Sequence, residues 1–118
     1  MANYSGSCHC GAVRFSLQTE TIDRGLRCNC SICVRKGALM SPEVYDVQQL
    51  RYEAEADALV CYQFGSGVAK HFFCGRCGIY PFHETLRQPG HYRVNLGCID
   101  QLDATTLPFQ VFDGKHLI

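Results

Sequence analysis

The chain has 118 residues, which is enough for one domain and too few for two ordinary ones. Apolar residues make up 47% of the sequence and charged residues 19%, so the composition supports a buried core and excludes a disordered chain. Eleven Lys and Arg residues balance eleven Asp and Glu residues, and a formal charge of zero argues against a protein that binds nucleic acids non-specifically.

No apolar run reaches the roughly 20 residues that a membrane-spanning helix needs, so we expect no membrane partner. The first residues, Met1 to Gly6, contain neither a basic segment nor an apolar one, and we therefore expect no secretory signal and a cytoplasmic protein. Because no internal repeat, low-complexity stretch or linker divides the sequence, we expect a single domain over residues 1–118.

The predicted elements, taken in chain order, are mostly short strands. The first covers residues 13–17, where apolar residues alternate with polar ones as in a half-buried strand. The run Ser41-Pro42-Glu43 is typical of a helix N-terminus, so a short helix is expected to follow it. Residues 44–58 fit either a helix or a strand.

The second half of the sequence contains further strand patterns. Residues 59–64 are β-branched and aromatic, and we expect them to pair with residues 68–73 across a glycine-rich turn. Residues 79–82, 91–96 and 110–112 are three more strand candidates, and the apolar residues of 91–96 lie on one face. The sequence thus predicts a small, mainly β domain with little helix and long connections, which bound metal ions would stabilise.

Cysteine is strongly over-represented, with nine residues in 118. An odd number without a secretory signal argues against a disulfide scaffold, and in a reducing compartment such abundance indicates metal thiolates. Cysteines this close together rarely bond to each other, but they can converge on one ion. Seven of the nine form three tight groups, which are Cys8-His9-Cys10, Cys28-Asn29-Cys30-Ser31-Ile32-Cys33 and Cys74-Gly75-Arg76-Cys77.

The spacing within these groups suits zinc, which takes four protein ligands in a closed structural site and three in an open catalytic one. Cys74 and Cys77 have the spacing of half a zinc knuckle, and the glycine after them permits the positive φ that such turns use. Cys8 and Cys10 form a second pair, also followed by glycine, and two pairs make a closed site. The remaining triplet can then hold another zinc with one position open. A partition in which one pair joins two cysteines of the triplet is also compatible with the spacing.

The three cysteine motifs, in this order, resemble those of the glutathione-dependent formaldehyde-activating enzyme family, which includes centromere protein V. The resemblance rests on the segments GSCHCGAVRF (6–15), CNCSICVRKG (28–37), FCGRCG (73–78) and NLGCID (95–100), and it covers essentially the whole chain. It implies a β-tent fold, in which twisted antiparallel sheets surround a structural zinc. It also implies that Cys8, Cys10, Cys74 and Cys77 hold this zinc and that Cys28, Cys30 and Cys33 hold a second, catalytic zinc.

The resemblance further implies a carbon–sulfur lyase that acts on a thiol adduct of a small aldehyde, such as S-hydroxymethylglutathione made from formaldehyde and glutathione. A thiolate bound to zinc stays ionised at neutral pH, and zinc polarises a carbonyl or stabilises an alkoxide. Two other functions stay open. One is a non-catalytic, zinc-stapled domain that binds a protein or a nucleic acid, and the other is a metal-storage or redox protein.

Two cations, Arg35 and Lys36, directly follow the triplet. They fit a solvated turn, or an anion clamp for a substrate carboxylate, to which Arg binds with two parallel hydrogen bonds. We expect Gly37 to close this short turn or helix.

Each of five other side chains could have either of two roles. His9 is expected to point away from the metal, although it lies between two ligands. His71 and His83 are expected to be structural, but either could act as a general acid or base because histidine titrates near neutrality. Cys61 and Cys98 are expected in the core, where free cysteine acts as a small apolar residue, with Cys98 as the alternative site-lining thiol.

Overall fold

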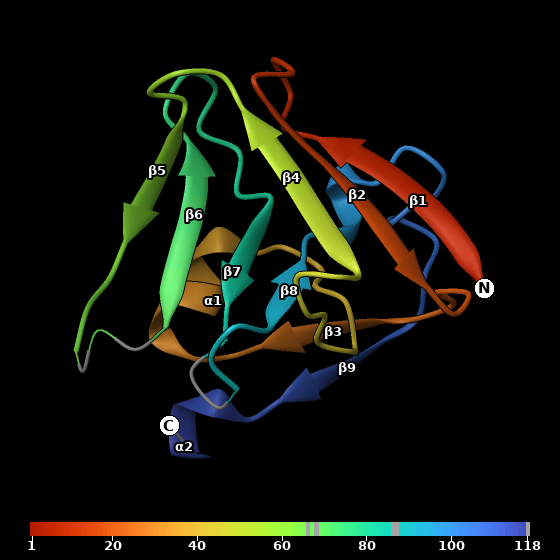
Figure 1. Cartoon of the computed structure of the whole chain (residues 1–118). Coiled ribbons are helices and arrows are strands. Elements are labelled where there is room, and N and C mark those ends of the chain that lie inside the picture. The colour runs from red at the N-terminus through yellow and green to blue at the C-terminus, as the bar shows by residue number, and fades with distance from the viewer. Residues whose placement is uncertain (66, 68, 86–87, 118) are drawn as a thin grey trace.

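The structure is a computed structural model, and it describes residues 1–65, 67, 69–85 and 88–117 (Figure 1). Strands dominate and the helices are short, so the mainly β class predicted from the sequence is confirmed. The strands are β1 (Ala2–Ser7), β2 (Val13–Thr19), β3 (Gly25–Cys28), β4 (Leu50–Ala54), β5 (Leu59–Tyr62), β6 (Lys70–Cys74), β7 (Phe82–Glu84), β8 (Tyr92–Val94) and β9 (Phe109–Phe112). The helices are α1 (Ser31–Lys36), the 3-10 helix η1 (Leu96–Cys98) and α2 (Gly114–Leu117). None of these described helices is both long and apolar enough to cross a membrane.

The strands form three sheets. One antiparallel sheet has the order β1-β2-β4, and a second has the order β5-β6-β7-β8. The third sheet pairs β3 with β9 in parallel, which differs from the antiparallel sheets that the family resemblance implies. Parallel partners need a long connection between them. The chain from β4 to β8, which builds most of the other two sheets, supplies that connection.

The core lies between the two antiparallel sheets. In β2, Val13, Phe15 and Leu17 are buried and the residues between them are exposed, as the alternating pattern predicts. Phe82 of β7 and Val94 of β8 are also buried, and the rings of Phe15 and Phe82 meet edge to face with their centroids 6.3 Å apart. This apolar contact fixes which face of the β5–β8 sheet turns toward the core.

The opposite face of the same sheet carries a polar row. The register places His71 of β6 beside His83 of β7, and His83 beside Arg93 of β8. Because side chains alternate along a strand, these three lie on the face away from Phe82 and Val94. Figure 1 shows α1 next to β6 and β7, and Lys36 of α1 contacts His83. The fold therefore places two imidazoles and a guanidinium on one sheet face, from which His83 meets the helix that carries part of the cysteine triplet.

Several predicted strands are confirmed. β5 and β6 pair antiparallel from Leu59 and Cys74 to Tyr62 and His71, as expected for 59–64 and 68–73, although Ser66 and Val68 lie outside the described residues. β9 confirms the last predicted strand, at 110–112. The ambiguous segment 44–58 contains β4, so its strand reading is the correct one.

Two predicted strands have different bounds in the structure. The strand expected at 79–82 begins only at Phe82, because the Cys74 N–H donates to the Ile79 carbonyl oxygen and closes a turn up to that point. The strand expected at 91–96 ends at Val94. Leu96 instead belongs to η1, where the Asn95 side chain accepts a hydrogen bond from the Gly97 N–H.

The prediction of a helix after Ser41-Pro42-Glu43 is wrong, because the structure describes all of residues 44–58 and has no helix there. The side chain of Ser41 is fully buried, donates to the Glu43 carbonyl oxygen and accepts from the Val94 N–H. Backbone bridges from Met40 to Leu26 and to Asn95 hold the chain extended just before this serine. Tertiary pairing thus outweighs a local capping signal, since that signal contributes only about 1 kcal/mol.

Candidate metal centres and the adjoining cavity

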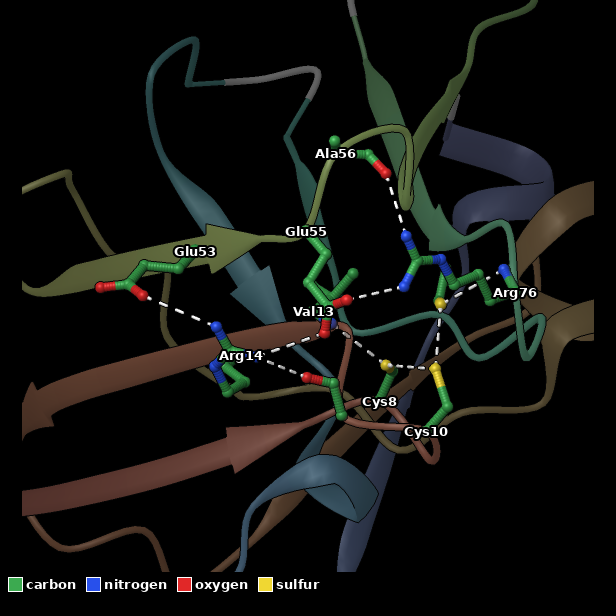
Figure 2. A network of polar contacts seen from close by, with 10 residues as sticks. Cys8, Cys10, Val13, Arg14, Glu53, Glu55, Ala56 and Arg76 are labelled. Carbon is green, nitrogen blue, oxygen red and sulfur yellow. Dashed lines mark hydrogen bonds and ion pairs between the residues drawn. The ribbon is translucent and has the colours of Figure 1, made fainter.

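Four cysteines from two distant parts of the chain form the first cluster, which we call the closed cluster. Cys8 and Cys10 lie in the connection between β1 and β2, Cys74 ends β6, and Cys77 lies in the following turn. Their sulfur atoms all lie within 4.8 Å of one another. The Sγ atoms of Cys8 and Cys10 are 3.7 Å apart, and those of Cys10 and Cys74, 64 residues apart in sequence, are also 3.7 Å apart (Figure 2).

These distances fit a zinc ion. A tetrahedron with Zn–S bonds of about 2.3 Å has edges of about 3.8 Å between sulfur atoms. Backbone N–H groups also point at the sulfurs, from Val13 to Cys8 at 3.3 Å and from Arg76 to Cys74 at 3.4 Å. Gly11 (φ 82°) and Gly78 (φ 79°) adopt the positive φ predicted for the glycines after each pair.

An ion-pair network flanks the closed cluster. Arg76, inside the knuckle, donates to a Glu55 carboxylate oxygen at 2.7 Å and to the Ala56 carbonyl oxygen at 3.1 Å. Arg14 approaches the same carboxylate at 3.9 Å and donates to the Gly11 carbonyl oxygen at 2.8 Å. Figure 2 shows Glu55 between the two arginines, with Arg76 on the side of the cysteine sulfurs. The Arg76 guanidinium interacts electrostatically with Cys10 and Cys74 and would offset part of the excess negative charge that four thiolates bring to a divalent ion.

The second cluster, the open cluster, comes from one short segment. Cys28 ends β3, Cys30 is the N-cap of α1, and Cys33 lies in the first turn of that helix. The three sulfur atoms lie within 4.8 Å of one another, and the Cys30 N–H points at the Cys28 Sγ from 3.4 Å. Gly37 ends α1 in the left-handed conformation (φ 65°), as predicted.

The structure therefore brings seven cysteines together as four and three, which is one of the partitions that the spacing permits. His9 is exposed and belongs to neither cluster. Of the two remaining cysteines, Cys98 is buried as expected, and burial raises the pKa of its thiol to about 12. The expectation that Cys61 is buried is wrong. Cys61 is exposed because β5 is an edge strand whose residues contact the core only at Leu59.

A cavity of about 580 Å³ opens beside the open cluster. The three cysteines of that cluster form part of its wall, and His71, His83 and Arg93 line it from the polar face of the β5–β8 sheet. Leu26, Met40 and Phe112 are among the apolar residues that complete the wall. Three sulfur atoms at the edge of a cavity suit a three-ligand zinc site with one position accessible to a small molecule.

The two cations that follow the triplet point in different directions. The Lys36 Nζ lies 3.9 Å from the centroid of the Tyr80 ring and 3.4 Å from the His83 Nδ1. Burial lowers the pKa of Lys36, whereas the thiol of Cys33 acts to raise it. Arg35 is exposed and donates to the Ser31 carbonyl oxygen at 2.7 Å, within its own helix. Lys36 thus faces the cluster and Arg35 faces solvent.

The environment of the triplet affects its thiols differently. Burial raises the pKa of Cys33 to about 12, although the charge of Lys36 opposes this. Burial also acts to raise the pKa of Cys30, but hydrogen bonds from Cys33 and Ile32 outweigh it, so that the pKa of Cys30 is lowered. A positive charge at this position would therefore be needed to ionise all three thiols together.

Both buried histidines at the cavity are neutral at pH 7. Burial lowers the pKa of His71 to about 4 and that of His83 well below its ordinary range, and the charge of Lys36 acts in the same direction on both. The His71 Nδ1 and the Tyr80 hydroxyl share a hydrogen bond of 2.6 Å. The cavity therefore holds two uncharged imidazoles close to three thiols.

The sequence did not single out Arg93, which lines the cavity, or Tyr80, which contacts His71 and Lys36. The alternation predicted for 91–96 already placed Arg93 on the face opposite its apolar neighbours, and this was the available signal. Tyr80 gave none, because it lies in the turn between the knuckle and β7.

Comparison with known proteins agrees with this arrangement. The family model described as "Glutathione-dependent formaldehyde-activating enzyme" matches residues 3–114. A crystal structure of a Rhodobacter sphaeroides protein, a Northeast Structural Genomics target, is similar with a TM-score of 0.78 and 34% sequence identity, over 90% of this chain and 99% of that one. With a matching family model over nearly its whole length and a shared fold, the chain belongs to the glutathione-dependent formaldehyde-activating enzyme family.

Proposed function

We propose that the protein is a zinc-dependent carbon–sulfur lyase that acts on a thiol adduct of a small aldehyde, with S-hydroxymethylglutathione as the type of substrate. The observation that carries this proposal is the contrast between the two clusters. Four sulfurs close around one point, whereas three sulfurs lie at the wall of a cavity large enough for a small molecule. Family membership supports formaldehyde and glutathione as the reacting partners.

Each cluster has its own role in this proposal. Cys8, Cys10, Cys74 and Cys77 hold a structural zinc, which ties the β1–β2 connection to the end of β6. Cys28, Cys30 and Cys33 hold a second zinc at the cavity. When bound there, zinc supplies a Lewis acid and keeps sulfur ionised at neutral pH.

Cleavage of the adduct is balanced without any further reactant. The hydroxyl group of the adduct loses its proton, the carbon–oxygen bond becomes a carbonyl, and the electron pair of the carbon–sulfur bond stays with sulfur, which gains a proton to give the thiol. His71 and His83 are neutral and line the cavity, so either ring can accept the hydroxyl proton. The Lys36 ammonium, beside His83 and the thiol of Cys33, stabilises negative charge that develops on sulfur.

We also propose Lys36 and Arg35 as residues that attract an anionic substrate. For Lys36 the support is its inward position against Tyr80 and His83. For Arg35 the support is its place on α1, the helix that carries Cys33 and Ile32 of the cavity wall. A cytoplasmic location fits the proposal, because a reducing compartment keeps the seven clustered thiols free to bind metal.

The test is exchange between free formaldehyde plus glutathione and their adduct, followed by magnetisation-transfer NMR. We expect wild-type protein with two zinc ions per chain to accelerate the exchange, and Cys30→Ser to remove the acceleration. The control is Cys61→Ser, which replaces an exposed cysteine outside both clusters and should behave like wild type. A protein with two zinc ions and no acceleration would favour the metal-storage alternative, and one zinc ion without acceleration would favour the binding module.

A further inference from the structure

The cavity wall carries a cation that the proposed reaction does not use. Arg93 lies on β8, is paired with His83 across the sheet, and lines the cavity together with the open cluster. Its Nη1 donates to the carbonyl oxygens of Ser41 at 2.8 Å and Pro42 at 2.7 Å. These two bonds fix the guanidinium from one side.

The charge of Arg93 lacks a close partner within the described part of the chain. The acid that acts on it most strongly, Glu43, is not within ion-pair distance of it. Glu43 instead lies 3.9 Å from Arg24, and its side chain is 68% exposed. Burial lowers the pKa of Arg93, but a guanidinium remains charged at neutral pH. Glu43 also lines the cavity, but its carboxylate lies beyond ion-pair distance of the guanidinium, so the fixed positive charge of Arg93 forms no ion pair among the described residues.

The donors of Arg93 are only partly used. A guanidinium has five N–H donors, and among the described residues the protein engages only those on Nη1. The remaining donors form the planar fork that matches a carboxylate with two parallel hydrogen bonds. The apolar side chains of Leu26, Met40 and Phe112 share the same cavity, and their low polarity strengthens an ion pair formed inside it.

We propose that Arg93 is a specificity-determining residue that binds a carboxylate of the thiol substrate inside this cavity. The inference rests on the proposed lyase function, because the sulfur of the same substrate has to meet the open cluster. It predicts that the enzyme selects thiols that carry a carboxylate over neutral thiols of the same size. It also assigns anion recognition to the sheet that faces α1, in addition to the helix itself.

The test compares two probe thiols of equal size, 3-mercaptopropionate and 3-mercaptopropionamide, by isothermal titration calorimetry with the zinc-loaded protein. We expect wild type to bind the acid about tenfold more tightly than the amide. In Arg93→Gln, which keeps a polar, uncharged side chain but removes the guanidinium, this preference should disappear while the affinity for the amide stays within about twofold. The matched control is Arg51→Gln, an exposed arginine on β4 of the other sheet, which should keep the wild-type preference.

Three results would overturn the role of Arg93. Equal binding of acid and amide by wild type removes the carboxylate site but leaves the lyase proposal intact. Weaker binding of both thiols to Arg93→Gln by the same factor shows that Arg93 is merely structural. Failure of both thiols to bind wild type removes the proposed function together with this inference. If Arg93→Gln does not fold, Arg93→Lys replaces it, and the acid-over-amide preference should then fall at least about threefold because the fork is lost.

Discussion

His71 shows how a single residue at the cavity depends on its surroundings. Its ring is buried, shares a hydrogen bond with the Tyr80 hydroxyl and lies next to the ring of His83, with the two centroids 5.6 Å apart. Burial, assisted by the charge of Lys36, lowers the pKa of His71 to about 4, below the ordinary value of 6.5. Between pH 4 and pH 6.5 this ring is therefore neutral in the folded protein, whereas it is protonated in the unfolded chain.

This neutral ring makes stability depend on pH. Above pH 6.5 the His71 ring is neutral in both the folded and the unfolded chain, and its contribution to the free energy of unfolding is fully present. As the pH falls from 6.5 toward 4, the ring takes up a proton in the unfolded chain only, and this contribution is lost. His71→Asn keeps a hydrogen-bonding partner for Tyr80 and cannot titrate. Between about pH 7 and about pH 5, wild type should lose about 1 kcal/mol more unfolding free energy than His71→Asn. Urea unfolding at both pH values measures this, and parallel losses in the two proteins would contradict it.

Lys36 is the second residue whose position makes a prediction. Replacement by Met keeps an unbranched side chain against Tyr80 and removes the charge beside the open cluster. Charge-assisted interactions contribute about 1.5–3 kcal/mol, so kcat/KM should fall by about tenfold or more in Lys36→Met. Steady-state kinetics should show a smaller fall in Arg35→Met, whose side chain is exposed. A larger effect at Arg35 than at Lys36 would reverse the assignment.

At the level of the elements, β1 lies unusually close to its neighbours. A Cβ on Gly6 would lie 2.5 Å from the Cys98 carbonyl oxygen and would also overlap the Phe15 ring. Backbone atoms of η1 and a core side chain thus meet β1 at a point where only glycine fits. This contact sets β1 against the core beside the closed cluster, which begins at Cys8.

Gly6→Ala should therefore destabilise the fold by about 2 kcal/mol, as overpacking in a core does. Chemical denaturation of the purified protein measures the change. The comparison variant is Ser16→Ala, at an exposed position of the adjacent β2, for which we expect a change within about 0.5 kcal/mol. Similar stability of Gly6→Ala and Ser16→Ala would show that the chain relaxes around the added methyl group.

The elements also show what the sequence could predict. Alternation predicted β2, and the turn between 59–64 and 68–73 predicted the pairing of β5 with β6. β1 and β3 were missed because neither alternates clearly, and the buried positions of β1 are Tyr4 and Gly6, one of them without a side chain. The helix after Ser41 was predicted wrongly, since its signal is local and the bonds that overrule it come from β8, which is distant in sequence.

In the candidate site too, local sequence patterns could be predicted and contacts between distant segments could not. The cysteine groups are local patterns, so the sequence could separate four ligands from three, although spacing alone did not exclude another partition. Arg93 reaches the cavity only because β6, β7 and β8 align side by side, and no local pattern contains that information. The inward turn of Lys36 and the outward turn of Arg35 likewise depend on where α1 packs.

Across the whole molecule, the two clusters have different mechanical roles. The closed cluster joins sulfurs 64 residues apart in the chain, whereas the open cluster lies within β3 and α1. The zinc that we propose at the closed cluster would therefore contribute to folding, with free energies of the order of 10 kcal/mol in small zinc peptides. The open cluster closes only a local loop, so a metal bound there would contribute less to holding distant segments together.

Cys74→Ser should consequently melt at a lower temperature than Cys30→Ser, by about 10 °C or more. Both variants replace one sulfur by oxygen, so the comparison isolates which cluster has lost a ligand. Calorimetry of the zinc-loaded proteins measures the two transitions. Equal melting temperatures, or a lower one for Cys30→Ser, would show that the closed cluster does not hold the fold together.

The most direct test of the two-centre account is stepwise removal of zinc by a mild chelator. Zinc content, circular dichroism and carbon–sulfur lyase activity are followed on the same sample. We predict that about one zinc per chain leaves first, that activity falls with it and returns when zinc is added back, and that the circular dichroism spectrum persists throughout. Simultaneous loss of both ions and of the fold, or full activity after the first ion has gone, would contradict the account.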